Sequence, residues 1–213
     1  MQVMVAATDY FTAQLHDVKN AKAMEYITTR VGKDLTKKFM LGYAPPGWSN
    51  AKDYLTSSGW KLDALINTGI VKENNKKQTY DFYRDRLIFP IQTHGGKIIS
   101  FGGRDLSGDK SAAKYLNGQE TEIYRKDKIL YGLNFAMPKV REKDGVYLVE
   151  GYTDVIAMHR AKVENTVAPC GTALTLEQVK LIGRFTKNVT LVYDGDAAGK
   201  KAIEKNGRLI IEN

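Results

Sequence analysis

Three acidic residues follow two apolar stretches of the sequence. Glu150 ends the run Val146-Tyr147-Leu148-Val149, and Asp194 and Asp196 follow the run from Asn188 to Tyr193. Continuous apolar runs of this length, bounded by glycine or turn residues, are typical of strands buried in a parallel sheet. Because open α/β sheets bind ligands at the carboxyl ends of their strands, both runs would deliver carboxylates to one sheet edge.

Carboxylates gathered at a sheet edge favour a hard divalent cation. Asp194 and Asp196 are two residues apart, so in extended backbone their side chains point to the same side. Mg²⁺ prefers oxygen ligands and is usually held by one or two carboxylates together with substrate phosphates. The pattern therefore predicts a Mg²⁺ site for phosphoryl transfer, with Glu150 as ligand or general base and Asp154 as a helix cap or as support for Glu150.

A purely structural interpretation of the same residues stays open. Asp-Gly is a common turn, and Asp196 could cap a helix that begins at Ala197. Glu150 is harder to explain in this way, because a carboxylate that ends an apolar strand is costly unless it is solvated, paired or bound to metal.

The second part of the chain alternates between strand-like and helix-like patterns. We expect strands at 146–149, 166–169 and 188–193, and helices at 153–161, 175–184 and from 197. Alternation with short connections predicts a parallel, Rossmann-like sheet with right-handed crossovers. If the first and third strands are neighbours, Glu150 and Asp194 meet at the point where the strand order reverses.

The first part reads as helices followed by a hairpin. Thr8 or Asp9 could cap a helix that runs to Ile27, and shorter helices are expected at 34–40, 51–58 and 61–68. Apolar strands at 87–93 and 97–104 flank His94-Gly95-Gly96, and Pro90 between them favours an edge position or a bulge. With a boundary in the charged segment 139–145, we expect an α+β subdomain at 1–144 and an α/β subdomain at 145–213.

Composition and charge narrow the function classes. The single cysteine, Cys170, excludes an internal disulfide and a cysteine-rich zinc site, and no apolar run approaches the ~20 residues of a membrane span. We therefore expect a cytoplasmic protein with no membrane partner. Residues 1–144 hold 23 basic and 16 acidic side chains, whereas residues 145–213 hold 9 and 8. Such a division suits a chain that holds a polyanion with its first part and binds metal with its second.

Several motifs in order resemble a known family. Glu150-Gly151-Tyr152-Thr153-Asp154, Gly171-Thr172-Ala173-Leu174-Thr175 and Asp194-Gly195-Asp196-Ala197-Ala198-Gly199 resemble the Toprim signature of primases, topoisomerases and some nucleases. The upstream segments resemble the catalytic core of DnaG-type bacterial primases: Phe39 to Pro45, Asp85-Arg86-Leu87-Ile88-Phe89-Pro90-Ile91, Phe101-Gly102-Gly103-Arg104, Lys114-Tyr115-Leu116-Asn117, Glu120-Thr121 and Lys126 to Leu133.

This resemblance implies a nucleotidyltransferase that copies single-stranded DNA into short RNA primers during replication in a bacterium or phage. A primer 3′-hydroxyl would attack the α-phosphate of an NTP, and Mg²⁺ or Mn²⁺ would be held by Glu150, Asp194 and Asp196, with Gly171 and Thr172 in support. Arg104, Lys114, Tyr115 and Lys126 would contact nucleotide and DNA phosphates. The implied partners are the template, NTPs, the RNA primer–DNA hybrid and a replicative helicase, and we expect a monomer.

The sequence departs from the family pattern in three places. It lacks an N-terminal zinc module, the further acidic residues of the next Toprim strand and a helicase-binding C-terminal domain. These absences predict a piece of the catalytic core with weakened or absent primer synthesis. Another Toprim enzyme, such as a nuclease or topoisomerase fragment, and a non-catalytic DNA-binding module remain alternatives.

Five remaining residues are expected to have packing or surface roles. They are Cys170, His94, His159, Trp48 and Trp60, and the two tryptophans are expected in the core of the helical part.

Overall fold

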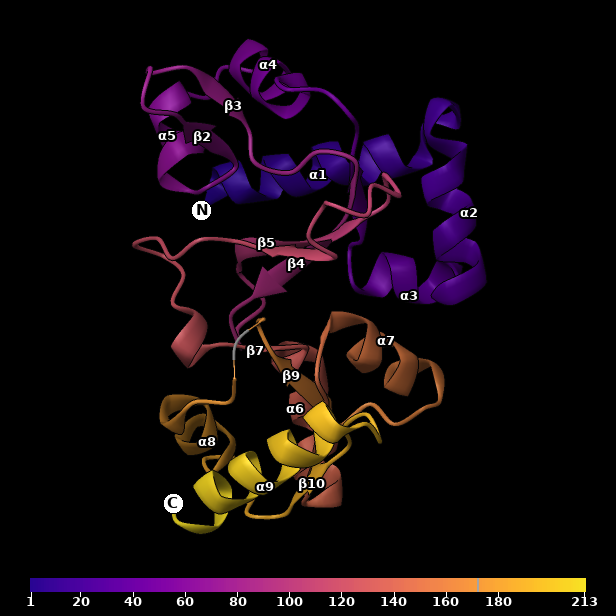
Figure 1. The fold of residues 1–213 in the computed structure, drawn as a ribbon, viewed down its shortest axis with the longest axis vertical. Coiled ribbons are helices and arrows are strands. Elements are labelled where there is room, and N and C mark those ends of the chain that lie inside the picture. The colour runs from indigo at the N-terminus through magenta and orange to yellow at the C-terminus, as the bar shows by residue number, and fades with distance from the viewer. Residues whose placement is uncertain (172) are drawn as a thin grey trace. The chain divides into compact units, whose positions relative to one another are not determined.

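Two sheets of four strands, each with helices and a hydrophobic core of its own, organise the residues that the structure describes. The structure is a computed structural model and describes residues 1–171 and 173–213. Residues 1–91 and 97–124 form one compact unit, and residues 92–96 and 125–213 form the other (Figure 1).

The first unit combines helices with antiparallel pairs of strands. Its sheet has the strand order β1-β4-β5-β6, and β2 pairs with β3 in a separate hairpin. Helix α1 packs against β1 so closely that a Cβ atom on Gly42 would lie 2.5 Å from Cβ of Phe11. The elements are α1 (Gln2–His16), η1 (Val18–Asn20), α2 (Ala21–Arg30), α3 (Lys33–Lys38), β1 (Gly42–Ala44), α4 (Asn50–Ser57), α5 (Leu62–Asn67), β2 (Val71–Glu73), β3 (Thr79–Asp81), β4 (Arg86–Gln92), β5 (Ile98–Asp105) and β6 (Tyr115–Asn117).

The expected N-terminal helix is wrong in its start and in its continuity. Helix α1 begins at Gln2, and Thr8 lies inside it, where its hydroxyl donates to the Met4 carbonyl. The helix ends at His16 because Asp17 is extended and its carboxylate accepts the Lys19 amide, which starts a 3₁₀ turn. Val18, which lies within the expected helix, is consequently 88% exposed.

The central strands of the first unit follow the expected hairpin pattern. Strands β4 and β5 are neighbours in the sheet, and the amide of Gly96 donates to the Thr93 carbonyl in the turn between them. Strand β4 is internal, not an edge as Pro90 favoured, because β1 pairs with it through Gly42 to Ala44. That pairing covers only residues 86–88 of β4, so Pro90 lies beyond its end. The missing amide of Pro90 therefore disrupts no bond to β1.

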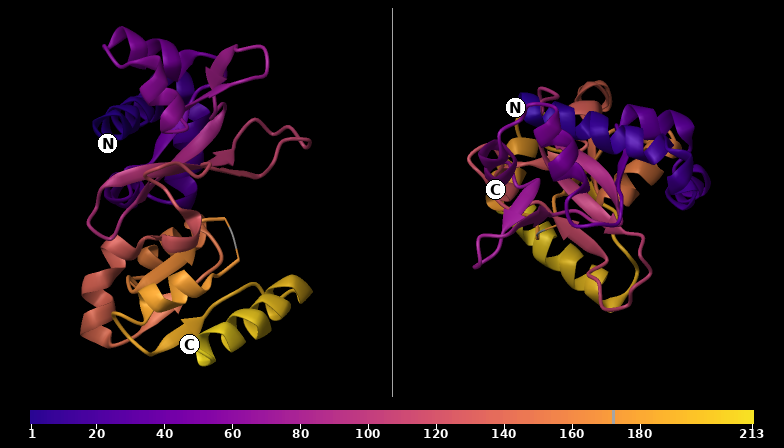
Figure 2. Two further views of the ribbon diagram at one scale, coloured as in Figure 1. Left: turned by 90° about the vertical axis from the view of Figure 1, so that its left-hand side faces the viewer. Right: turned by 90° about the horizontal axis from the view of Figure 1, so that it is seen from above.

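The second unit has the three parallel strands that the sequence predicts and one further, antiparallel edge strand that it does not. The strand order is β10-β8-β9-β7, in which β8 is parallel to β10 and β9, and β7 is antiparallel to β9. Figure 2 shows α6 and α9 on opposite faces of this sheet. The elements are η2 (Lys126–Lys128), β7 (Leu130–Tyr131), α6 (Leu133–Lys143), β8 (Val146–Leu148), α7 (Tyr152–Arg160), β9 (Thr166–Pro169), α8 (Leu176–Ile182), β10 (Val189–Leu191) and α9 (Ala197–Ile211).

The charged segment 139–145 is largely helical in the structure. Helix α6 runs to Lys143, and it packs on β9, the strand with which β7 also pairs. Residues 125–144 therefore share a compact unit with the parallel sheet, and the units divide between Tyr124 and Arg125.

The structure gives the positions of three of the five residues that were expected to have packing or surface roles. Trp48 is 65% exposed, so its expected core position is wrong. Its ring instead lies against Tyr80 and carries the guanidinium of Arg84 at 4.1 Å from the ring centroid. Cys170 and His159 are buried. None of the helices in residues 1–171 and 173–213 has the length and apolar character needed to cross a bilayer.

Candidate functional site

Glu150 and Asp194 meet at the carboxyl ends of two adjacent parallel strands. Leu148 of β8 pairs in register with Leu191 of β10, and the amide of Val192 donates to the Leu148 carbonyl. Just beyond this pairing, Glu150 Oε1 accepts a hydrogen bond of 3.0 Å from the amide of Asp194. The condition stated from the sequence is therefore met, because the first and third strands are neighbours and bring their terminal acids together.

Asp196 has a structural contact of its own. Its Oδ1 accepts the amide of Gly199 at 2.8 Å, so it caps the N-terminus of α9. Glu150, Asp194 and Asp196 are all exposed, and Val149, Tyr193 and Gly199 beside them are buried or half-buried. Water and a ligand can therefore reach the carboxylates, while the backbone that carries them is fixed in the core.

A cavity of about 310 Å³ opens beside these acids. Its walls include Glu150 and Asp196 together with Tyr193, Lys205 and Asn206. The Asn206 amide donates to the Tyr193 hydroxyl at 2.8 Å. Burial raises the pKa of Tyr193, the Asn206 hydrogen bond opposes that rise, and the charge of Glu150 adds to it. The phenol therefore stays protonated and holds the turn after β10 against α9.

The turn between β10 and α9 depends on Gly199. A Cβ atom at this position would lie 2.0 Å from the Asp194 carbonyl oxygen and 2.9 Å from its carbon. No side chain fits such a contact without a shift of the backbone. The glycine thus allows the helix to approach the strand end that carries Asp194.

We call Glu150, Asp194 and Asp196 at the two strand ends the acid edge. The chemistry of these side chains fits a hard divalent cation. Within residues 1–171 and 173–213, no three His, Cys, Asp or Glu side chains form a ready-made metal cluster. The side chains of Glu150, Asp194 and Asp196 offer carboxylate oxygens, and Mg²⁺ needs only one or two protein carboxylates when water and substrate phosphates complete its octahedron. Glu150, Asp194 and Asp196 could each hold the ion directly, because the hydrogen bonds to Glu150 and to Asp196 each engage one oxygen of a two-oxygen carboxylate.

The remaining residues predicted around the acids have structural contacts. Asp154 accepts the amide of Gly151 at 2.9 Å and caps α7, as one of its two expected roles requires. Gly171 has a positive φ of 74°, which favours glycine. Thr172 lies outside the described residues. Thr175 and Gln178 form a capping box at the start of α8.

Basic and aromatic side chains gather on the first unit around Arg104. The guanidinium of Arg104 donates to the Tyr115 hydroxyl at 3.0 Å and lies 5.2 Å from the ring centroid of Tyr26. Arg30, one turn further along α2, lies 5.9 Å from the same ring. Distances within about 6 Å are those of cation–π contacts. We call Tyr26, Arg30, Arg104, Lys114 and Tyr115 the basic–aromatic cluster.

Two members of this cluster were missed in the sequence. Tyr26 and Arg30 stand at i and i+4 on α2, a spacing that places an aromatic ring and a cation on one helix face. Lys114 is exposed, and its carbonyl accepts the amide of Asp105, so it lies beside the end of β5. Lys126, predicted with them, belongs to the second unit, where its carbonyl accepts a hydrogen bond from Gln178.

Comparison with known proteins gives one consistent family. Residues 10–137 match the model for the N-terminal domain of the DNA primase catalytic core, and residues 144–212 match the Toprim domain. A DNA primase of Clostridium acetobutylicum is 42% identical over 199 residues, which are 93% of this chain and 32% of that protein. The chain thus spans about a third of the length of the curated relative.

Solved structures agree with this result. The chain superposes on a DNA primase domain from Pseudomonas aeruginosa with a TM-score of 0.91 and 37% identity, covering 100% of this chain and 66% of that one. A DnaG primase catalytic domain bound to single-stranded DNA matches with a TM-score of 0.85 and 35% identity, covering 96% and 64%. These matches confirm the expected fold, an α+β subdomain followed by an α/β Toprim subdomain. Carrying the core domain and the Toprim domain in the family's order, the chain belongs to the DnaG-type DNA primases.

Proposed function

We propose that this chain is the catalytic part of a DNA primase, a nucleotidyltransferase that copies single-stranded DNA into short RNA primers. The observation that carries the proposal is the meeting of Glu150 and Asp194 at adjacent parallel strand ends in a chain of this family. The proposed reaction joins a primer 3′-hydroxyl to the α-phosphate of an NTP and releases pyrophosphate.

The acid edge and its surroundings would position the reacting phosphates. A bound Mg²⁺ or Mn²⁺ would neutralise charge on the attacking and leaving oxygens. Glu150 and Asp194 would hold that ion, and Asp196 would complete the acid set. Lys205, in the wall of the same cavity, could neutralise phosphate charge at its rim. Asn206 and Tyr193 would keep the acid-bearing turn in place.

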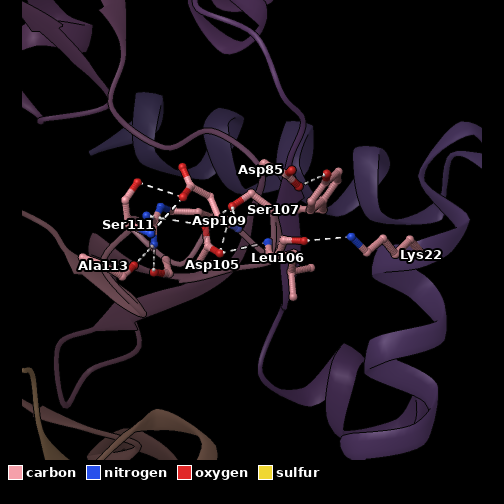
Figure 3. A network of polar contacts seen from close by, with 12 residues as sticks. Lys22, Asp85, Asp105, Leu106, Ser107, Asp109, Ser111 and Ala113 are labelled. Carbon is pink, nitrogen blue, oxygen red and sulfur yellow. Dashed lines mark hydrogen bonds and ion pairs between the residues drawn. The ribbon is translucent and has the colours of Figure 1, made fainter.

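The basic–aromatic cluster would bind nucleic acid. Guanidinium and ammonium groups suit phosphates, and aromatic rings such as the half-buried Tyr26 and Tyr115 suit stacking with unpaired bases. The combination therefore fits a single strand without sequence preference. Figure 3 shows the polar network of the loop that precedes Lys114 and Tyr115. Lys126 would contact nucleotide phosphates from the second unit. The proposal further takes NTPs, the RNA primer–DNA hybrid and a replicative helicase as partners, and the cytoplasm as location.

A primer-synthesis assay tests the proposal. The chain would be assayed alone, and also as a chimera in which it replaces the matched residues of the Pseudomonas aeruginosa primase, with template, Mg²⁺ and labelled NTPs. Short RNA products from the chimera support the proposal, and we expect weak or absent synthesis by the chain alone. Cleaved DNA would instead indicate a Toprim nuclease.

A non-catalytic DNA-binding module is the second candidate. It is favoured by one observation, the gathering of basic and aromatic side chains around Arg104 on the first unit. Binding of template by the chimera with no RNA product, under conditions in which the parent primase is active, would decide for this candidate.

Arg104→Ala is expected to weaken binding of single-stranded DNA. The slope of log K against log salt should fall by about 1, because one phosphate contact and its released counterion are lost. Lys76→Ala, in the exposed loop between β2 and β3, is the matched control and should leave both values nearly unchanged. Fluorescence anisotropy with a labelled oligonucleotide at several salt concentrations gives the affinity and the slope. An unchanged slope for Arg104→Ala would remove this residue from the proposed interface.

A further inference from the structure

Arg86 is a buried cation that none of the proposed binding roles uses. It is 8% exposed at the start of β4, so its guanidinium faces the protein and not solvent. One of its nitrogens, Nη1, donates to the Gly103 carbonyl at 3.2 Å and to the Ala113 carbonyl at 2.9 Å. The other, Nη2, lies 3.7 Å from Oδ1 of Asp105. A single side chain thus joins three points of the chain.

These three points flank the proposed phosphate-binding residues. Gly103 directly precedes Arg104, Asp105 directly follows it, and Ala113 directly precedes Lys114. Arg104 on β5 is also paired in register with Tyr115 on β6, the residue after Lys114. The guanidinium of Arg86 therefore connects the Gly103 backbone and the Asp105 side chain, on the two sides of Arg104, with the backbone that precedes Lys114.

The neighbouring residues leave room for this connection. A Cβ atom at Gly103 would lie 3.0 Å from Cδ of Arg86 and 2.8 Å from Cδ1 of Tyr83. The Tyr83 hydroxyl in turn donates to the Phe101 carbonyl at 2.7 Å. The absence of a side chain at Gly103 lets the stem of Arg86 and the ring of Tyr83 pack directly on β5.

The loop that Arg86 ties down is ordered by short-range hydrogen bonds. Asp105 accepts the Ser107 hydroxyl, and Asp109 accepts the amide and hydroxyl of Ser111, all at 2.8 to 2.9 Å (Figure 3). Outside the loop, the Leu106 amide donates to the Asp85 carbonyl. The Leu106 carbonyl accepts the Lys22 ammonium at 3.1 Å, which links the loop to α2, the helix of Tyr26 and Arg30.

Burial of an ion pair does not by itself explain this residue. Removing two charges from water costs about as much as their attraction returns, so a buried pair is weak evidence for stability. The planar guanidinium of arginine holds its donors in fixed directions, so it can bind several acceptors at once. The ammonium of lysine is a point charge without this geometry. The acceptors here are two backbone carbonyls and one carboxylate of the binding segments.

We propose that Arg86 is a positioning residue for nucleic-acid binding, which sets the spacing of Arg104 and Lys114 without touching the ligand. This inference rests on the proposed function, because it presumes that those two side chains bind phosphates. It adds that the affinity for nucleic acid depends on a buried side chain outside the basic–aromatic cluster.

The test is Arg86→Lys in the 213-residue chain, in a double-mutant cycle with Lys114→Ala. Arg86→Lys keeps the charge and loses the planar guanidinium, so binding of a labelled single-stranded oligonucleotide should weaken about fivefold to tenfold and the salt slope should fall. In the Lys114→Ala background the same change should have a smaller effect, because residues that act through one another are not additive. Full additivity, or unchanged affinity for Arg86→Lys, would overturn the proposal.

Two further variants separate positioning from general destabilisation. Ile88→Val, in the same strand and fully buried, should lower thermal stability without changing the affinity or the salt slope. Gly103→Ala should reproduce the Arg86→Lys binding defect, because the added methyl displaces the Arg86 stem. If Ile88→Val weakens binding as much as Arg86→Lys does at equal stability, the effect is not one of positioning.

Amide hydrogen exchange distinguishes failure of this inference from failure of the proposed function. Without DNA, Arg86→Lys should speed exchange at Asp105, Leu106 and Ser111, whose amides are bonded within or beside the loop. Unchanged exchange overturns the connection itself. Normal protection in the unsubstituted chain together with no oligonucleotide binding would refute the proposed function and, with it, the positioning role.

Discussion

Replacing Glu150 with Gln is expected to abolish divalent-metal binding while leaving the fold intact. The amide oxygen of glutamine can still accept the Asp194 amide, the bond that Glu150 Oε1 makes at 3.0 Å. The negative charge, however, is gone, and a hard cation depends on that charge. Because the side chain is exposed, the free energy of unfolding should change by less than about 0.5 kcal/mol.

Mn²⁺ binding measured by electron paramagnetic resonance, with an NTP present to supply phosphate oxygens, is the direct test. The affinity for Mn²⁺ should fall at least about 100-fold, and primer synthesis by the chimera should fall with it. Glu142→Gln is the matched control, since Glu142 is an exposed glutamate at the end of α6 that is not part of the cavity wall. Equal Mn²⁺ affinity for Glu150→Gln and the unsubstituted chain would contradict the assignment of the acid edge.

The acid edge could be predicted from sequence because each step of the inference is local. The runs Val146 to Val149 and Asn188 to Tyr193 identify two strands by composition, and their ends carry Glu150 and Asp194. The expected burial of the second run is wrong, because β10 lies at the edge of the sheet and Thr190 and Val192 are exposed. Only the neighbour relation between the two strands needed the structure, and the crossover rule limits that relation to few possibilities. The parallel pairing of β8 with β10 is one of them.

The role of Arg86 could not be predicted in this way. Its contacts are to backbone carbonyls at Gly103 and Ala113, 17 and 27 residues away, and carbonyls have no sequence signal. The break after His16 was missed for a related reason. The apolar spacing continues through Val18, but the carboxylate of Asp17 offers the backbone an alternative hydrogen bond and ends the helix.

The exposed position of Trp48 shows a limit of burial statistics. Tryptophan is highly buried on average, which favoured a core position. Here its ring is covered on one side by the Arg84 guanidinium and contacted by Tyr80. A cation–π contact of this kind stabilises an exposed ring by about 0.5–1 kcal/mol, so partial burial by a charged side chain replaces burial in the core.

Gly199→Ala is the second substitution with a large expected effect. Alanine is the better helix former by about 1 kcal/mol, so helix propensity alone predicts stabilisation. The added Cβ, however, would lie 2.0 Å from the Asp194 carbonyl oxygen, and backbone cannot yield as a flexible side chain would. The clash should dominate, with a net loss of about 1–3 kcal/mol in the free energy of unfolding.

The same substitution at Gly207 provides the control within helix α9. A Cβ atom there has no neighbour within 4 Å, so Gly207→Ala should stabilise the chain by about 0.5–1 kcal/mol. Urea denaturation of both variants gives the two free energies, and Mn²⁺ titration shows whether the acid edge survives. Gly199→Ala should lose metal affinity because relief of the clash must move Asp194, whose amide is held by Glu150. Similar stability and normal Mn²⁺ affinity for both variants would show that the close approach of α9 to the strand end does not constrain the site.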